Sequence, residues 1–214
     1  MKKQKTREKF TQYYELLDAF KEDGCPICTK LQKGNRLYLD SLLYEHVNDP
    51  PLRTHLRSSM GFCHRHSQQA IELGDRFGLS IIYEDLLSGV LASSERDESP
   101  PNSTGMCPAC VQEHVTEENV LQVTLNFLDE PEFQDGLRNA QPFCLNHSNK
   151  LIGLEKRKDR RAALLRSQCE KLRSLHHNLK EFIRKHDHRY QHEKIGEDEA
   201  ISWRRAIQYF VGTS

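Results

Sequence analysis

Apolar residues recur every three or four positions along most of the chain, which is the spacing of one face of an α-helix. The longest such run predicts an amphipathic helix and consists of Leu165, Cys169, Leu172, Leu175, Leu179, Phe182 and Ile183. A shorter last helix is predicted to begin near Glu197 and to carry Ile201, Trp203, Ala206, Ile207 and Phe210. Alternation typical of a β-strand extends over no more than a few residues. We therefore expect an all-α protein.

One pattern of cysteines and apolar residues occurs twice along the chain. The first copy carries Cys25-Pro-Ile-Cys28 and Phe62-Cys63-His-Arg-His66, and the second carries Cys107-Pro-Ala-Cys110 and Phe143-Cys144-Leu-Asn-His147. Apolar positions between these motifs match at an offset of 82 residues and, after a one-residue gap, of 81 residues. Pro50 then falls on Pro131, which places the same proline-marked turn in both copies. The match indicates an internal duplication.

The duplication predicts a helical bundle of two tandem repeats that share one core. The four expected parts are a first repeat over 1–92, a linker over 93–106, a second repeat over 107–155, and a long helix with a short terminal helix over 156–214. In each copy a helix follows the first cysteine pair, a short helix follows the proline, and Cys63 or Cys144 opens a third helix. In the first repeat we expect a break at Arg76-Phe77-Gly78 and a further helix from about Ser80 to Ala92.

The residue types and their spacing predict two zinc sites. Cys-Pro-x-Cys, here called a knuckle, presents two thiolates from one turn, and Cys-x-x-His at a helix start places both side chains on one face. A knuckle and a Cys-x-x-His pair supply the four ligands of a closed, structural zinc site. We expect each knuckle to pair within its own copy, and an exchange of knuckles between copies is the alternative. The expected ligand sets are Cys25, Cys28, Cys63 and His66, and Cys107, Cys110, Cys144 and His147.

Comparison of the copies excludes two other histidines. His64 corresponds to Leu145 and His114 to Gln32, so neither histidine recurs. The remaining cysteine, Cys169, lies in the apolar run of the long helix, where we expect it to be a core residue. For the repeated ligands an iron–sulfur cluster, or a disulfide or redox pair, is the alternative to zinc.

Composition and charge narrow the classes of function. Seven cysteines without a secretory signal indicate metal binding in a reducing compartment, so we expect a cytoplasmic protein. No apolar run is long enough to cross a membrane. The formal net charge is zero, yet the segment 150–194 is basic and the segment 97–137 contains no Lys or Arg. This distribution allows internal compensation or a surface for an acidic partner.

The sequence contains no recognisable catalytic constellation. We therefore expect a non-enzymatic, zinc-stabilised scaffold that binds a macromolecular partner, a protein rather than a nucleic acid, and no membrane. A thiol-based redox or metal-responsive regulator, nucleic-acid binding through residues 150–194, a homo-oligomer, and an enzyme whose site forms between the copies stay open. In the last helix, we expect Trp203, Ile207 and Phe210 to pack on the protein's own bundle, with docking into a partner as the alternative.

The two motif pairs, together with the closing Trp203-Arg-Arg-Ala-Ile-Gln-Tyr-Phe-Val-Gly212, resemble a bacterial family catalogued as a domain of unknown function. The resemblance covers about Phe10 to Gly212. It implies a bacterial cytosolic protein with the same eight ligands and implies no activity. The second copy departs from the first at Met106 and Pro142, where the first has Gly24 and Gly61, and this difference affects only the local turns.

Overall fold

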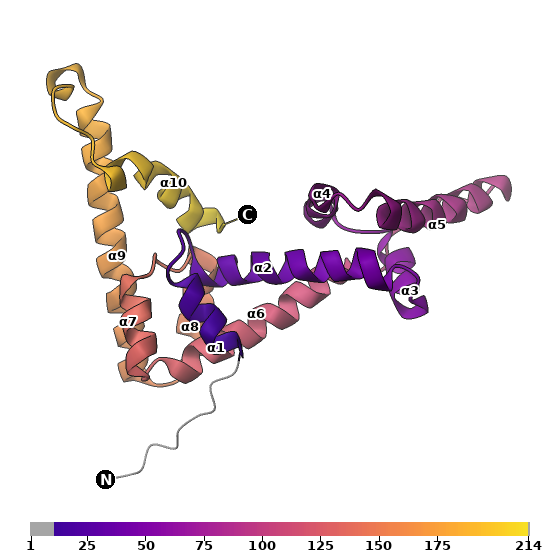
Figure 1. Ribbon diagram of the computed structural model, residues 1–214, viewed down its shortest axis with the longest axis horizontal. Helices are drawn as coiled ribbons and strands as arrows, with labels where there is room; N and C mark the ends of the chain where they lie inside the picture. Colours follow the sequence, from indigo (N-terminus) through magenta and orange to yellow (C-terminus); the bar gives the residue numbers. More distant parts are fainter. Residues whose placement is uncertain (1–10, 214) are drawn as a thin grey trace, which may run out of the picture. The chain divides into compact units, whose positions relative to one another are not determined.

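The computed structural model describes residues 11–213, most of which form α-helices joined by turns and loops (Figure 1). Within these residues there is no β-strand, so the predicted all-α class is confirmed. No helix in this part of the chain is long and apolar enough to cross a membrane.

The helices repeat in the order that the duplication predicts. The first copy comprises α1 (Thr11–Ala19), α2 (Pro26–Ser41) with a π-helical turn η1 (Leu42–His46), α3 (Pro50–Ser59), α4 (His64–Leu73) and α5 (Arg76–Glu95). The second comprises α6 (Pro108–Phe127), α7 (Pro131–Asn139) and α8 (Leu145–Leu154), followed by α9 (Lys158–Lys185), a 3₁₀ turn η2 (His188–Tyr190) and α10 (Glu197–Val211). Prolines begin α2, α3, α6 and α7, because the first helical position needs no N–H donor.

The helix after α4 begins earlier than expected. α4 ends at Leu73 and is capped by Gly74, whose φ of +82° is the left-handed conformation that glycine favours. Asp75 then caps α5, since its carboxylate accepts a hydrogen bond of 2.9 Å from the backbone N–H of Gly78. The predicted break at residues 76–78 was therefore wrong by about two residues. α5 also continues to Glu95, into the segment expected to be linker.

The chain forms two compact units, and each unit combines parts of both copies. Among the described residues, the first unit contains those up to Lys30 and those from Asn119 onward, and the second unit contains Leu31–Glu118. These units are not the predicted repeats, so the boundaries predicted for the two repeats and the linker stay a prediction.

Aromatic residues from distant parts of the sequence form the core of the first unit. Tyr13 on α1 and Phe133 on α7 are fully buried. The ring of Phe127 lies 4.7 Å from that of Tyr13, and the ring of Phe20 lies 4.9 Å from that of Phe133. The Tyr13 hydroxyl donates a 2.9 Å hydrogen bond to Glu132, so its polar end has a partner. These contacts hold α1 against the start of α7.

The core of the second unit is mainly aliphatic. Its buried residues come from α2, η1, α3, α4, α5 and the start of α6, and include Leu39, Leu42, Leu43, Leu56, Phe62, Ala70, Ile82, Leu86 and Ala109. Cys107 belongs to the same buried cluster. The second knuckle therefore rests on this core.

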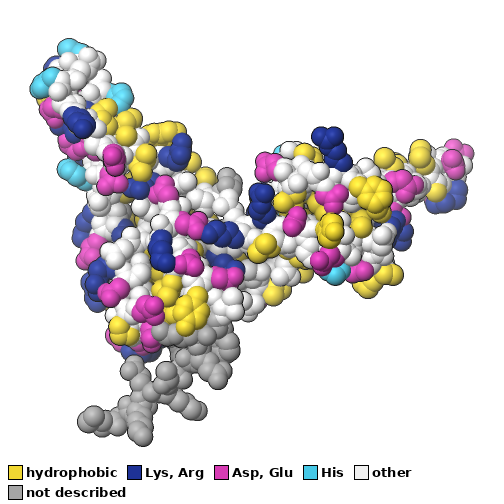
Figure 2. All heavy atoms as spheres, viewed as in Figure 1, with side chains coloured by type: hydrophobic (Ala, Val, Ile, Leu, Met, Phe, Trp, Pro, Cys, Tyr) yellow, Lys and Arg dark blue, Asp and Glu magenta, His cyan; other side chains and the backbone are white. Residues whose placement is uncertain are grey.

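The face that α9 and α10 bury is displaced from the predicted one. Leu164 and Gln168 are buried on α9, whereas Cys169 is exposed, so the expectation of a core cysteine was wrong. The stripe of α9 that packs against other helices contains positions 164 and 168, which lie one residue earlier in the sequence than 165 and 169. On α10, Trp203, Ile207 and Phe210 are 47%, 54% and 68% exposed, which also corrects their expected packing within the bundle. Figure 2 shows hydrophobic side chains at the surface over α9 and α10.

Candidate metal centres

All four ligand pairs occupy the same position relative to a helix. Cys25, Cys63, Cys107 and Cys144 each immediately precede the first residue of a helix, and the second ligand of each pair is the third residue of that helix. Cys63 and Cys144 have nearly identical extended backbone angles, with φ of −65° and −61° and ψ of 164° and 163°. A helix N-terminus carries partial positive charge and stabilises a thiolate. Each ligand pair therefore lies at a helix N-terminus, which favours the thiolate over the protonated thiol.

The first cluster lies in the first unit, where the starts of α2 and α8 meet. It consists of Cys25, Cys28, Cys144 and His147, all of them buried. The Sγ atoms of Cys28 and Cys144 lie 3.7 Å apart. The Nδ1 atom of His147 lies 3.5 Å from Cys25, 3.4 Å from Cys28 and 3.2 Å from Cys144. Four possible ligand atoms therefore face one point.

The second cluster lies in the second unit, where the starts of α4 and α6 meet. It consists of Cys63, His66, Cys107 and Cys110, of which the first and last are partly exposed. The Sγ atoms of Cys63 and Cys110 lie 3.6 Å apart. The Nδ1 atom of His66 lies 3.3 to 3.6 Å from the three sulfur atoms. The arrangement matches that of the first cluster.

These distances fit a tetrahedral site for one ion. A zinc ion bound at the usual Zn–S and Zn–N lengths separates two sulfur ligands by about 3.8 Å, and a sulfur and a nitrogen by about 3.6 Å. The seven cysteines all carry free thiols. Either group of four side chains can therefore hold a single metal ion.

The ligands pair across the copies, and the expected pairing within each copy was wrong. Each knuckle meets the Cys-x-x-His pair of the other copy. The reason lies in the lengths of the helices. α2 has 16 residues and rises about 24 Å, whereas the ten residues of α3 rise only about 15 Å, so α3 alone does not bring the chain back to Cys25 before Cys63. The 20 residues of α6 and the nine of α7 have the same effect in the second copy.

His64 and His114 are exposed and lie outside both clusters, as the comparison of the copies predicted.

The C-terminal residues cover the first cluster. A Cβ atom at Gly212 would lie 3.2 Å from the Cys28 sulfur, and a Cβ atom at Gly24 would lie 2.6 Å from the side chain of Thr213. Both glycines have positive φ, of +84° and +100°. The closing Gly212 of the sequence motif thus has a structural reason, because a residue with a side chain would crowd the thiol and strain the backbone.

The ionisable groups of the clusters shift one another's pKa. Burial raises the pKa of Cys25, and a hydrogen bond with Cys144 lowers the pKa of Cys28. Burial lowers the pKa of His147, but hydrogen bonds with Cys144 and Cys28 outweigh this effect and raise the pKa to about 10. Crowded thiols of this kind cannot all ionise unless a cation lies between them.

In the second cluster, burial and a hydrogen bond with Cys63 raise the pKa of Cys110 to about 12. Burial also raises the pKa of Cys107, but hydrogen bonds from His66 and from backbone N–H groups bring it down to about 6. The thiols of the second cluster therefore also differ in how readily they lose a proton.

A carboxylate lies behind the histidine of the second cluster. The Nε2 atom of His66 lies 3.5 Å from Glu113 and 3.4 Å from the side-chain nitrogen of Asn35. Glu113 also pairs with the guanidinium of Arg65 through two contacts. Burial raises the pKa of Glu113, but hydrogen bonds with His66 and Arg65 lower it to about 2. Such a carboxylate orients a metal-binding histidine and raises its basicity.

The two clusters differ in this outer layer. Glu113 lies three residues after Cys110, and the corresponding residue after Cys28 is Leu31. Arg65 lies two residues after Cys63, and the corresponding residue after Cys144 is Asn146. Sequence reasoning missed Glu113, although its spacing of three from a ligand on one helix was the available signal.

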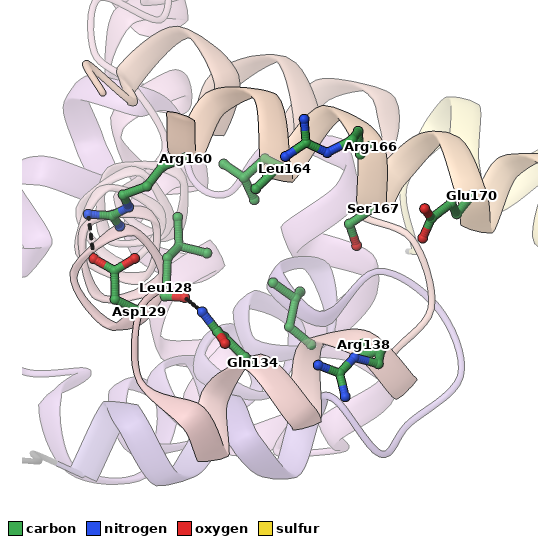
Figure 3. A pocket seen from close by; sticks show the side chains of 11 residues that line it. Leu128, Asp129, Gln134, Arg138, Arg160, Leu164, Arg166, Ser167 and Glu170 are labelled. Atoms are coloured by element: carbon green, nitrogen blue, oxygen red, sulfur yellow. Dashed lines mark hydrogen bonds and ion pairs between the residues drawn. The ribbon is translucent and has the colours of Figure 1, made fainter. Parts of the chain in front are cut away.

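The first unit also contains a pocket that no motif predicted. It has a volume of about 380 Å³ and lies between α7, α9 and the turn after α6 (Figure 3). Leu128, Leu137 and Leu164 line it together with the polar residues Arg138, Arg160, Arg166, Gln134 and Glu170. Arg160 pairs with Glu155 at 3.1 Å and with Asp129 at 3.8 Å. The pocket is separate from both clusters, since none of the residues that line it is a member of either.

Comparisons with known proteins identify the family. The model of a family of unknown function, DUF6062, matches residues 7–103 and 101–214, so the chain belongs to this family. The two matches fit a tandem repeat, and the expected resemblance to a family of unknown function is confirmed. A relative in Caldicellulosiruptor sp. (strain Rt8B.4), described as an uncharacterised 23.9 kDa protein in the xynA 3′ region, is 26% identical over 203 residues, which cover 92% of this chain and all of the relative. No solved structure matches the chain.

Proposed function

We propose that the protein binds two zinc ions, one in each cluster, and acts as a zinc-stabilised helical scaffold for a partner protein rather than as an enzyme. The observation that carries the proposal is the convergence of three cysteines and one histidine in each compact unit, with all ligand atoms of a group within 4.8 Å of one another. Cysteine and imidazole ligands in a tetrahedral arrangement are characteristic of structural zinc.

The spacing of the ligands favours one ion over an iron–sulfur cluster. Each ligand of a [4Fe–4S] cluster binds a different iron atom, which holds the ligands farther apart than ligands of a shared ion. Here the Sγ atoms of Cys63 and Cys110 are separated by only 3.6 Å. With all four positions supplied by the protein, a zinc ion has no open position for water or substrate, which supports a structural role.

Zinc binding of this kind contributes to folding. Structural zinc sites have apparent binding free energies of about 10–16 kcal/mol, which is as large as the whole stability of a typical domain at about 5–15 kcal/mol. Each compact unit contains one cluster at the junction of two helix starts. We therefore expect removal of the metal to unfold both units. Metal binding through thiolates requires reduced cysteines, which favours a location in the reducing cytoplasm.

The surface of α10 supports a protein as the partner. Trp203, Ile207 and Phe210 follow one another at spacings of four and three, so their exposed side chains form one apolar stripe. An amphipathic helix with such a stripe fits a hydrophobic groove or a second helix.

The basic segment 150–194 supports nucleic-acid binding less well, because much of its charge is compensated within the protein. Arg157 pairs with Asp129 and Asp159, and Lys185 pairs with Glu199. Arg184 pairs with Glu181 and Glu193. These ion pairs leave less positive charge for phosphate groups.

Elemental analysis of the purified full-length protein, with its visible spectrum, tests the metal. We expect two zinc ions per chain and no visible absorption. Iron together with visible absorption would show that the sites hold an iron–sulfur cluster instead of zinc. Protein that folds without metal would overturn the proposal.

Crosslinking in the native host tests the partner. We expect Ile207→Ser/Phe210→Ser to lose a crosslinked protein that the wild type and the control Leu165→Ser retain. Leu165 is 47% exposed on α9, so this control removes a comparable apolar side chain outside the stripe. An unchanged set of crosslinked proteins in the double variant would contradict docking through α10. Crosslinks to a second copy of the chain would identify a homo-oligomer as the occupant.

A further inference from the structure

We propose that the second cluster is an oxidant-responsive site, in which peroxide joins Cys63 and Cys110 in a disulfide and releases the metal, while the first cluster retains its metal. This inference rests on the proposed zinc binding. It assigns different roles to two sites that carry the same ligands.

The clusters differ first in access. In the first cluster Cys25, Cys28 and Cys144 are only 2%, 8% and 2% exposed. Gly212 and Thr213 lie over this cluster, next to Cys28 and Gly24. In the second cluster both Cys63 and Cys110 are partly exposed. The second cluster is therefore the less buried of the two, at the two residues Cys63 and Cys110.

The sulfur atoms of these two partly exposed residues are also neighbours. Their separation of 3.6 Å must shorten to about 2.05 Å in a disulfide. Cys63 precedes α4 directly, and Cys110 lies in the first turn of α6, so the small movement falls on helix ends. The other two ligands, His66 and Cys107, are buried behind them.

The charge around this pair favours reaction with peroxide. The guanidinium of Arg65 is about half exposed, and although it pairs with Glu113, which offsets part of its charge, it also interacts electrostatically with Cys63 and Cys110. A nearby cation stabilises the thiolate, which is the nucleophile in thiol oxidation. The corresponding residue of the first cluster is the uncharged Asn146.

The chemistry balances with hydrogen peroxide as the oxidant. The Cys63 thiolate attacks one peroxide oxygen, the O–O bond breaks, and hydroxide leaves, so that a sulfenic acid forms. The Cys110 thiolate then attacks this sulfur and displaces a second hydroxide, which forms the disulfide. Two protons from solvent convert the hydroxides to water, and two electrons pass from the sulfur atoms to peroxide. Only Cys107 and His66 would then remain to hold a zinc ion, which would be released as the hydrated ion.

The test is a peroxide titration of the zinc-loaded full-length protein, with released zinc read by a chromophoric chelator and cysteine oxidation mapped by peptide mass spectrometry. Cys169 is exposed and outside both clusters, so it serves as an internal standard of thiol reactivity. We expect one zinc per chain to be released, together with a Cys63–Cys110 disulfide, at doses that oxidise Cys169 and leave Cys25, Cys28 and Cys144 unmodified. Thiol reductant and added zinc should restore the second zinc.

Three results would overturn the inference: release of both zinc ions at one rate, no release after Cys169 is fully oxidised, or a disulfide within the first cluster. A protein without zinc before peroxide is added would instead show that the proposed zinc binding itself is wrong. Because Cys63→Ser or Cys110→Ser can unfold the second unit, Arg65→Asn is the second variant. It introduces the residue that the first cluster has, and we expect zinc release to slow by about threefold to tenfold. Asn146→Arg is its matched control. Release from Arg65→Asn at the wild-type rate would contradict the part assigned to Arg65.

Discussion

The sulfur atoms of Cys28 and Cys144 lie 3.7 Å apart although 116 residues separate them in the sequence. The same relationship recurs between Cys63 and Cys110, at 3.6 Å and a separation of 47 residues. Each zinc site in the proposal therefore joins the start of one helix from the first copy to the start of one helix from the second. Neither copy contains a complete site, so the duplication and the proposed metal binding depend on each other.

The carboxylate behind His66 predicts a loss of metal affinity at one site only. Removal of such an outer partner typically weakens metal binding by about 10- to 100-fold. We expect Glu113→Gln to weaken the second zinc by a factor in this range and to leave the first unchanged, as measured by competition with a chelator. Glu118→Gln, also on α6, is the control. Equal losses in both variants would mean that Glu113 acts only through the charge of α6.

The glycine beside Cys28 predicts a defect at the first site. Alanine at Gly212 would have to adopt a φ of +84° with its Cβ atom 3.2 Å from the sulfur. With ψ at 175°, this backbone conformation is essentially confined to glycine and alone costs a residue with a side chain about 1–3 kcal/mol. We expect Gly212→Ala to lower the free energy of unfolding in urea and to accelerate zinc transfer from the first cluster.

Gly153→Ala is the matched control for this variant. Gly153 lies inside α8, and a Cβ atom there meets nothing within 4 Å. Alanine should stabilise the helix by about 0.5–1 kcal/mol. If Gly212→Ala were as stable as this control, the C-terminal segment would not cover the first cluster as described.

A buried lysine predicts how stability changes with pH. Burial lowers the pKa of Lys171 to about 8, and its ammonium donates a 2.6 Å hydrogen bond to the carbonyl of Leu137. In the unfolded chain the pKa of a lysine is about 10.4. Between about pH 8 and pH 10 the unfolded state therefore binds more protons than the folded state, and the free energy of unfolding rises with pH. Below about pH 8 the buried charge lowers stability by a constant amount, on the order of 3 kcal/mol.

Lys171→Met tests this effect by difference. Denaturation of the wild type and the variant at pH values from 7 to 10 should give a stability difference that favours the variant at pH 7 and shrinks as pH rises. Other groups, including the cysteines, titrate equally in both proteins and cancel. A stability difference that does not change with pH would show that the folded protein does not bury the charged form of Lys171 at pH 7.

The sequence was sufficient for the helices and for the eight cysteines and histidines, but not for their pairing. Prolines 50 and 131 and the repeated Cys-x-x-His pairs are local signals, and the structure follows them. Both copies offer identical half-sites, so residue type could not decide which knuckle meets which pair. The decisive feature was the uninterrupted length of α2 and α6 relative to α3 and α7.

Periodicity likewise indicates which residues share a helix face, but not which face another helix covers. Leu164 and Leu165 both belong to apolar stripes of α9, and only the first is buried. The same limit explains Cys169 and the exposed residues of α10. Glu113 could be identified only once His66 was placed beside it.

Native mass spectrometry of two double variants tests the pairing of the ligands most directly. Cys28→Ser/Cys144→Ser removes two ligands of the first cluster, and Cys28→Ser/Cys63→Ser removes one ligand from each cluster. Pairing across the copies predicts one zinc per chain in the first variant and none in the second, against two in the wild type. None in the first variant and one in the second would contradict it, because that result requires each knuckle to bind with its own copy.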